Sequence, residues 1–167
     1  MSEKTFEDLF VSELKDVYDA EKRIIRSLPK LIKAAKSKKL SDALSDHLEQ
    51  TETHVTRLES IFERIGMAPK RKTCKAMVGL IAEAEELLEE SSDENVRDAA
   101  IIAAAQKVEH YEMATYGTLR EWAQVLSHLE VVATLQQTLE EEMAADKALT
   151  RISTTLNLGA AHSIPRG

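Results

Sequence analysis

The stretch KVEHYEMATYG, residues 107–117, places acidic and aromatic side chains in the middle of a long alanine-rich segment. Apolar positions around it recur at three- and four-residue spacing, which predicts one helix from about residue 93 to residue 126. An α-helix turns about 100° per residue, so each position can be assigned to a face. Glu109, Glu112 and Tyr116 fall on the apolar face, whereas His110 falls roughly on the opposite, outer face.

Other segments with the same apolar period predict further helices. Three long ones are expected at about residues 5–37, 40–65 and 130–156, and a short amphipathic one at about 77–88. Thr5 with Asp8 three residues later has the pattern of a capping box. Pro29 lies inside the first helix and predicts a kink or local break near Ser27 and Leu28.

The composition indicates an all-α protein. Glycine and proline are scarce, with 5 and 3 in 167 residues, whereas a β-sandwich or barrel needs frequent turn residues. Four long helices, with a small extra helix in the connection between the second and the last two, predict a ferritin-like antiparallel four-helix bundle. Residues 1–157 are expected to form this domain and residues 158–167 a flexible C-terminal tail.

The net charge and the cysteine count exclude several classes of function. A formal charge of −7 argues against nucleic acid as the main partner. The single Cys74 cannot form an internal disulfide or a multi-cysteine metal site. The sequence contains neither a signal-peptide pattern nor a run of about 18 apolar residues, so we expect a cytoplasmic protein without a membrane partner.

Acidic side chains fall on the apolar faces of three predicted helices. Glu21 interrupts the stripe of the first helix, Glu109 and Glu112 that of the alanine-rich helix, and Glu142 and Asp146 that of the last. Each acid taken singly could be a flanking, solvated side chain. Together they would be costly to bury, because each ionised carboxylate loses hydration worth several kcal/mol. The inner faces offer almost no Lys or Arg, so multivalent metal ions are the economical source of compensating charge.

The helix at 40–65 supplies nitrogen rather than acid. His47, Gln50 and His54 lie on or beside its inner face, and no carboxylate points clearly inward. Each histidine taken alone has a structural explanation as a hydrogen-bonded interior residue. Oxygen ligands with imidazole suit iron or manganese. The usual di-iron bundle takes a Glu from each of two helices and Glu-x-x-His from the other two.

Several segments together resemble a known family. They are KTFEDLF (residues 4–10), YDAEK (18–22), RDAAIIAAAQKVEHYEMATYGTL (97–119) and LEEEMAADKALT (139–150). The chain resembles the YciF/YciE-type bacterial stress proteins, a ferritin-like group whose relatives include rubrerythrin. The resemblance implies an antiparallel four-helix bundle, a homodimer, a di-iron centre in the middle of the bundle and a role in stress responses.

The resemblance also implies a set of ligands for two iron ions, with manganese as the other candidate. The acids carried over are Glu21, Glu109, Glu112 and Glu142. We expect Glu109 and Glu142 to be the bridges, and the further candidate ligands are His54, Asp146 and Gln50. The chain departs from the family pattern at two positions. Ala145 stands where a rubrerythrin-like helix has histidine, so Asp146 substitutes or the position is vacant. Gln50 stands where the family has an acid, so His54, His47 or a shifted Glu52 must compensate.

Two functions follow from these observations, and the sequence leaves open whether the protein is an enzyme. The first is a di-iron or di-manganese carboxylate protein that acts on O₂ or peroxide under stress. The second is a non-enzymatic stress or partner-binding bundle whose metal site is lost or weakened, as the departures at Gln50 and Ala145 favour. An iron-storage shell of the Dps type is a third, more distant hypothesis.

Overall fold

The computed structural model describes residues 4–163, and this range contains five α-helices and no strand. They are α1 (Phe6–Ala34), α2 (Lys38–Arg64), α3 (Lys75–Glu90), α4 (Glu94–Val125) and α5 (Leu129–Ala161). The all-helical prediction is confirmed, and each expected helix is present with ends shifted by a few residues. None of the helices between residues 4 and 163 combines the length and apolar character that a membrane span requires.

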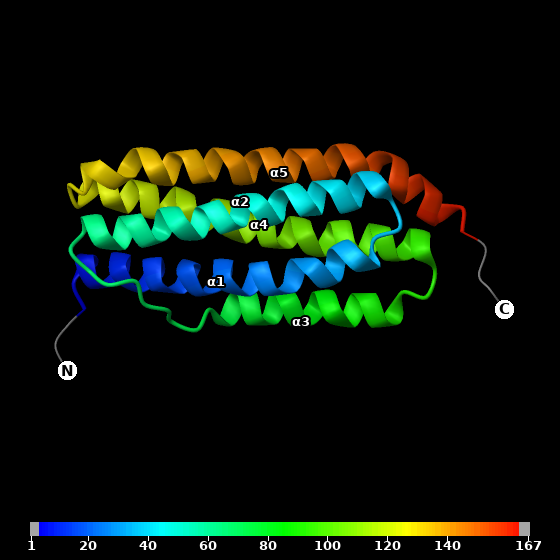
Figure 1. The fold of residues 1–167 in the computed structure, drawn as a ribbon, viewed down its shortest axis with the longest axis horizontal. Helices are drawn as coiled ribbons and strands as arrows, with labels where there is room; N and C mark the ends of the chain where they lie inside the picture. The colour runs from blue at the N-terminus through cyan, green and yellow to red at the C-terminus, as the bar shows by residue number, and fades with distance from the viewer. Residues whose placement is uncertain (1–3, 164–167) are drawn as a thin grey trace.

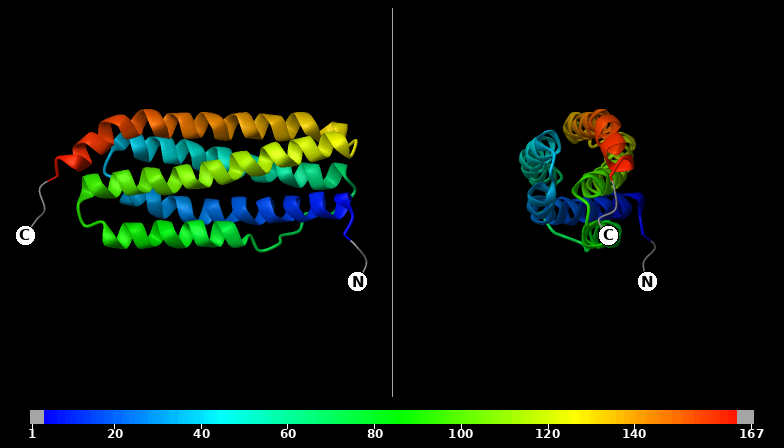
Figure 2. Two further views of the ribbon diagram at one scale, coloured as in Figure 1. Left: turned by 180° about the vertical axis from the view of Figure 1, so that it is seen from behind. Right: turned by 90° about the vertical axis from the view of Figure 1, so that its right-hand side faces the viewer.

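The four long helices lie side by side, and α3 packs outside them against α1 and α4 (Figure 1). Helices α1 and α2 form one hairpin, and α4 and α5 form the other. The connection from α2 to α4 returns along the length of the molecule and contains α3. Seen from the end, α1, α2, α5 and α4 surround a shared interior (Figure 2). Side chains from all four long helices can therefore meet there.

Local sequence signals set the helix ends. The capping box is formed: Thr5 Oγ1 accepts from the N–H of Asp8 at 3.0 Å, and Asp8 Oδ2 accepts from the N–H of Thr5 at 2.9 Å. Asp93 caps α4 by accepting from two backbone N–H groups. Gly66 follows the end of α2 with φ +75°, a conformation in which a side chain would be strained.

Two predicted features differ from the structure. Of the kink or local break predicted near Ser27 and Leu28, the break is absent, because the exposed Pro29 lies inside a helix that continues to Ala34. Helix α5 continues to Ala161, so residues 158–161, expected to begin the tail, are helical. The last part of that expected tail, residues 164–167, lies outside the described residues.

The buried apolar side chains form two clusters, one toward each end of the bundle. The first joins the N-terminal part of α1 to the C-terminal part of α2, and the second joins the opposite ends of these helices. Glu109, Glu112 and Glu142 fall between the two clusters along their helices, and Glu21 lies where the clusters meet on α1, next to Ala20 of the second. The interior is thus divided by a buried polar layer about midway along the molecule.

Candidate metal centre

Six side chains, contributed by all four long helices, make up the polar layer. They are Glu21 from α1, His47 and His54 from α2, Glu109 and Glu112 from α4, and Glu142 from α5. None of them is more than 6% exposed. Each lies on the stripe that its helix turns toward the interior, and the packing of the four helices brings the six together.

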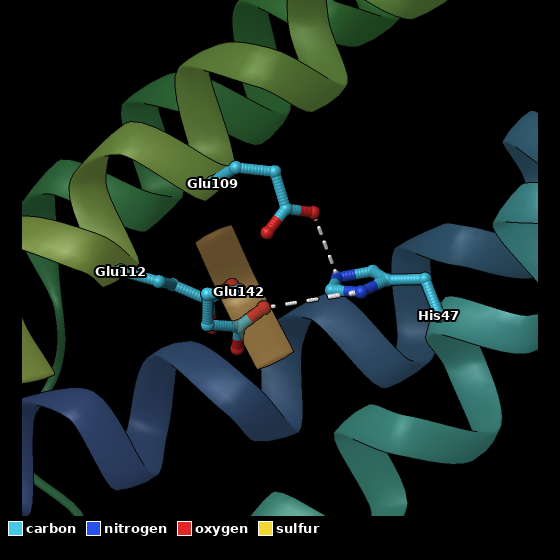
Figure 3. Close-up of side chains that lie close together, drawn as sticks. All are labelled: His47, Glu109, Glu112 and Glu142. Carbon is cyan, nitrogen blue, oxygen red and sulfur yellow. Dashed lines mark ion pairs between the residues drawn. The ribbon is translucent and has the colours of Figure 1, made fainter. Parts of the chain in front are cut away.

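The six residues form two groups that share Glu142. In one group, His47 Nε2 lies 3.1 Å from Glu109 Oε1, and His47 Nδ1 lies 3.9 Å from Glu142 Oε2 (Figure 3). Glu112 completes this group. In the other, His54 Nδ1 lies 2.9 Å from Glu142 Oε1 and 3.6 Å from Glu21 Oε1. Within each group the ligand atoms lie within 4.8 Å of one another, so each group could hold one metal ion.

The polar layer contains donors and acceptors that nothing satisfies. Within residues 4–163, nine buried side-chain oxygen and nitrogen atoms lack a hydrogen-bond partner, and all nine belong to these six residues. The contacts of His47 with Glu109 and of His54 with Glu142 are short, but they do not have hydrogen-bond geometry. Buried polar atoms in native proteins are nearly always paired, and a concentrated exception needs a specific explanation. Metal ions between the side chains would supply the missing partners, so the residues present fit such a group.

The charges of the layer lead to the same conclusion. Burial raises the pKa of Glu109 and of Glu112 well above its ordinary value, and the charge of Glu142 raises both further. Burial would also raise the pKa of Glu142, but His54 outweighs this and lowers it. Four ionised carboxylates would carry a charge of −4, which two divalent cations would neutralise. Without metal, the layer must take up protons.

His54 is held from outside the layer by Glu141. Its Nε2 lies 2.8 Å from Glu141 Oε2, and the Arg57 guanidinium binds both oxygens of this carboxylate at 2.7 and 2.9 Å. Arg57 lowers the pKa of Glu141 to about 2, so Glu141 is ionised and accepts the Nε2 proton. The Nδ1 atom then faces Glu142 and Glu21 as the available ligand atom.

Glu141 is adjacent to Glu142 and lies off the apolar stripe of α5, yet it contacts His54. Its side chain is 25% exposed and lies between α2 and α5. Tyr116, expected next to the site, is buried and donates a hydrogen bond to Glu21. Burial and the neighbouring Glu21 raise the pKa of Tyr116 well above its ordinary value, so its hydroxyl keeps its proton.

Five of the seven residues expected as ligands meet in the layer: Glu21, His54, Glu109, Glu112 and Glu142. The structure does not bring Gln50 or Asp146 into either group. Asp146 Oδ1 instead lies 3.2 Å from Nε2 of His110, whose side chain is 67% exposed. The outward position expected for His110 is therefore confirmed.

Burial distinguishes the remaining candidate ligands on α2 from one another. His47, expected on or beside the inner face of this helix and as a possible substitute for the missing acid, completes the layer. Glu52, another possible substitute, is exposed. The two imidazoles one heptad apart were the signal for both histidines. Glu142 belongs to both groups, whereas Glu109, the other expected bridge, belongs to one.

The fold and this layer define an all-helical protein with a buried cluster of four carboxylates and two imidazoles. The family described as "Domain of unknown function (DUF892)" matches residues 5–161, so the chain belongs to this family. It is 47% identical over 154 residues to Protein YciF of Escherichia coli (strain K12), covering 92% of this chain and 93% of the relative. The predicted resemblance to YciF is thus confirmed.

Two solved structures are close to this one. The crystal structure of the E. coli stress protein YciF has a TM-score of 0.88 at 46% identity and covers 92% of this chain and 98% of that one. YcfI of Rhodopseudomonas palustris, described as a candidate structural protein, has a TM-score of 0.87 at 46% identity and covers 88% and 94%.

Proposed function

We propose that this chain is a ferritin-like four-helix bundle whose polar layer binds two iron ions, or two manganese ions, and acts on O₂ or peroxide in a stress response. The observation that carries the proposal is the concentration of all nine unpartnered buried atoms in six side chains of suitable chemistry. The similarity to YciF, which is described as a stress protein, supports the physiological part.

The side chains would divide the work as follows. Glu21 and His54 would hold one ion and His47, Glu109 and Glu112 the other, with Glu142 between them. Iron bound there would supply redox and Lewis-acid chemistry. The chain itself fixes the ligands: Tyr116 orients Glu21, and Glu141 with Arg57 orients His54. The apolar clusters on either side lower the local dielectric constant, which would strengthen electrostatic interactions in the layer.

The activity is tested by peroxide and oxygen consumption of the iron-loaded protein. We expect turnover in the wild type and in Glu140→Gln, an exposed neighbour used as the matched control. Glu142→Gln removes the shared carboxylate and should lose nearly all turnover. Equal rates in the wild type and Glu142→Gln would exclude the polar layer as the reacting site.

A homodimer in the cytoplasm is also part of the proposal. Light scattering of the purified protein should give twice the chain mass of 18.7 kDa. A dodecamer-sized particle would instead favour an iron-storage shell.

A non-enzymatic stress or partner-binding bundle is the second candidate. It is favoured by the raised pKa values of Glu109 and Glu112, because protonated acids can stay buried without metal. In that case Glu109→Gln, which mimics the protonated acid, should leave stability unchanged or increase it. In a metal protein the same substitution should abolish binding. A large destabilisation that added iron reverses would contradict this second candidate.

A further inference from the structure

An open hollow of about 210 Å³ lies between α2 and α5 and reaches the polar layer. His47 and Glu109 line it from the inside, and both are more than nine-tenths buried. Both nitrogens of His47 and Oε2 of Glu109 have no hydrogen-bond partner among the described residues. The hollow therefore ends on polar atoms that a bound molecule could contact.

Small side chains create this space. Helix α5 contributes Ala144, Ala145 and Ala148 to its wall, where larger residues would close the hollow. Gln50, which lies outside the metal groups, and the exposed Asp46 add polar groups from α2. The Gln50 amide offers both a donor and an acceptor. The lining thus combines methyl groups with hydrogen-bonding atoms.

A second hollow reaches His47 and Glu109 from the opposite side, between α1, α3 and α4, and differs in size and chemistry. It measures about 30 Å³, and its lining is mainly apolar, with Ile24, Leu28 and Val108 among its residues. A cavity volume of about 10–15 Å³ is enough to hold one water molecule, so the larger hollow has room for a molecule of several non-hydrogen atoms. Of these two hollows, the larger is also lined by Asp46 and Gln50 of α2, and the smaller is not.

The charges of the lining restrict the ligand further. The exposed Asp46 carboxylate disfavours anions, and the methyl groups favour an apolar body. We propose that the hollow between α2 and α5 binds a small uncharged organic hydroperoxide, whose polar end faces His47, Glu109 and Gln50 and whose alkyl part lies against the α5 alanines. This inference rests on the proposed function, and it names the oxidant class and its point of entry.

Binding can be tested on the metal-free protein, independently of turnover. With alanine methyl groups labelled for NMR, tert-butyl hydroperoxide should shift the Ala145 and Ala148 signals in a saturable way. The signal of Ala103, an exposed residue of α4, should not move. Pivalate has nearly the same shape with a negative charge and should cause no such shift. Equal shifts from both probes, or none from either, would overturn the proposal.

A variant that fills the hollow provides the second test. Ala145→Leu should abolish the methyl shifts and lower kcat/KM for tert-butyl hydroperoxide by at least about tenfold, with unchanged helix and metal content. Ala103→Leu is the matched control and should behave as the wild type. If Ala145→Leu does not fold, Ala148→Leu fills the same hollow from three residues further along α5.

The remaining outcomes separate this inference from the proposed function. If Ala145→Leu slows metal loading but leaves hydroperoxide binding intact, the hollow is a cation route and the inference is wrong. If the wild type binds the probe but takes up no metal, the inference about the hollow stands and the proposed metal function fails.

Discussion

Arg57 lies outside the polar layer, yet it holds Glu141 and through it His54. Groups that orient a metal-binding histidine typically raise the metal affinity by about 10- to 100-fold. We expect Arg57→Met and Glu141→Gln each to weaken metal binding by roughly this factor, although neither residue is in the ligand groups. Competition with a chelator of known affinity measures the change.

The matched control for this prediction is Glu140→Gln, because Glu140 precedes Glu141 on the exposed side of α5. Among the described residues, its side chain accepts a hydrogen bond only from Gln136 on the same helix. The metal affinity should stay at the wild-type value in this variant. Unchanged affinity in Arg57→Met as well would show that His54 needs no outside support.

His54 makes the stability of the metal-free protein depend on pH. Burial would lower its pKa, but Glu142 and Glu21 raise it from 6.5 to about 10. Because the folded-state pKa is the higher one, the stabilisation is fully present below pH 6.5 and is lost as the pH rises through about 10. The melting temperature without metal should therefore fall between pH 7 and 10. In His54→Asn this pH-dependent stabilisation should be absent. If the melting temperature of that variant fell equally steeply with pH, other residues would be responsible for the pH dependence.

At the scale of the elements, Asp19 fastens the connection between α2 and α3 to α1. Its carboxylate accepts from Arg23 at 2.6 Å, from Arg71 at 2.8 Å and from the buried N–H of Cys74 at 2.8 Å. Burial would raise the pKa of Asp19, but these three partners lower it below its ordinary value. The carboxylate is therefore ionised and joins segments that are distant in sequence.

Asp19→Ala leaves the Cys74 N–H without its acceptor and should lower the free energy of unfolding by roughly 2–3 kcal/mol. Urea denaturation measures this loss. Asp42→Ala is the control, since Asp42 forms an ion pair with Lys38 whose side chains are 60% and 86% exposed. Exposed ion pairs contribute little to the free energy of unfolding. Equal losses in the two variants would contradict the anchoring role of Asp19.

Helical periodicity predicts most of the fold and of the polar layer, because each acid can be assigned a face from its own helix alone. This applies to Glu21, Glu109, Glu112 and Glu142. Contacts between helices are not contained in that pattern. Glu141 faces Arg57 across the α2–α5 seam, so its position between two helices, rather than its place on one, determines its role.

Contacts between helices also explain the other differences between the predicted and the observed structure. Asp146 lies on the predicted stripe of α5, but its position near the edge brings it to the exposed His110. Asp19 and Arg71 are separated by 52 residues, and no local pattern links them. Pro29 sits in α1 without ending the helix, since packing of Leu28 and Leu31 in the core holds the helix on both sides of it.

At the scale of the whole molecule, metal binding should stabilise the bundle, because the ligands come from four helices that must be assembled to bind. Free metal at about 100 times the dissociation constant would add about 2.7 kcal/mol. For a chain of this length that corresponds to a rise in Tm of about 5–10 °C. Calorimetry with and without iron measures the shift, and a chelator should reverse it. If iron-loaded Glu142→Gln had the same Tm as the iron-loaded wild type, the assignment of Glu142 to the metal site would be contradicted.

The central claim, that the polar layer is a two-metal site, is tested most directly by counting bound metal in protein produced with abundant iron. Elemental analysis should give about two ions of iron, or of iron and manganese together, per chain in the wild type and in Glu140→Gln. The Glu142→Gln variant should lose both ions, because Glu142 belongs to both ligand groups. Fewer than about half an equivalent of tightly bound metal in the wild type would contradict a site of this kind.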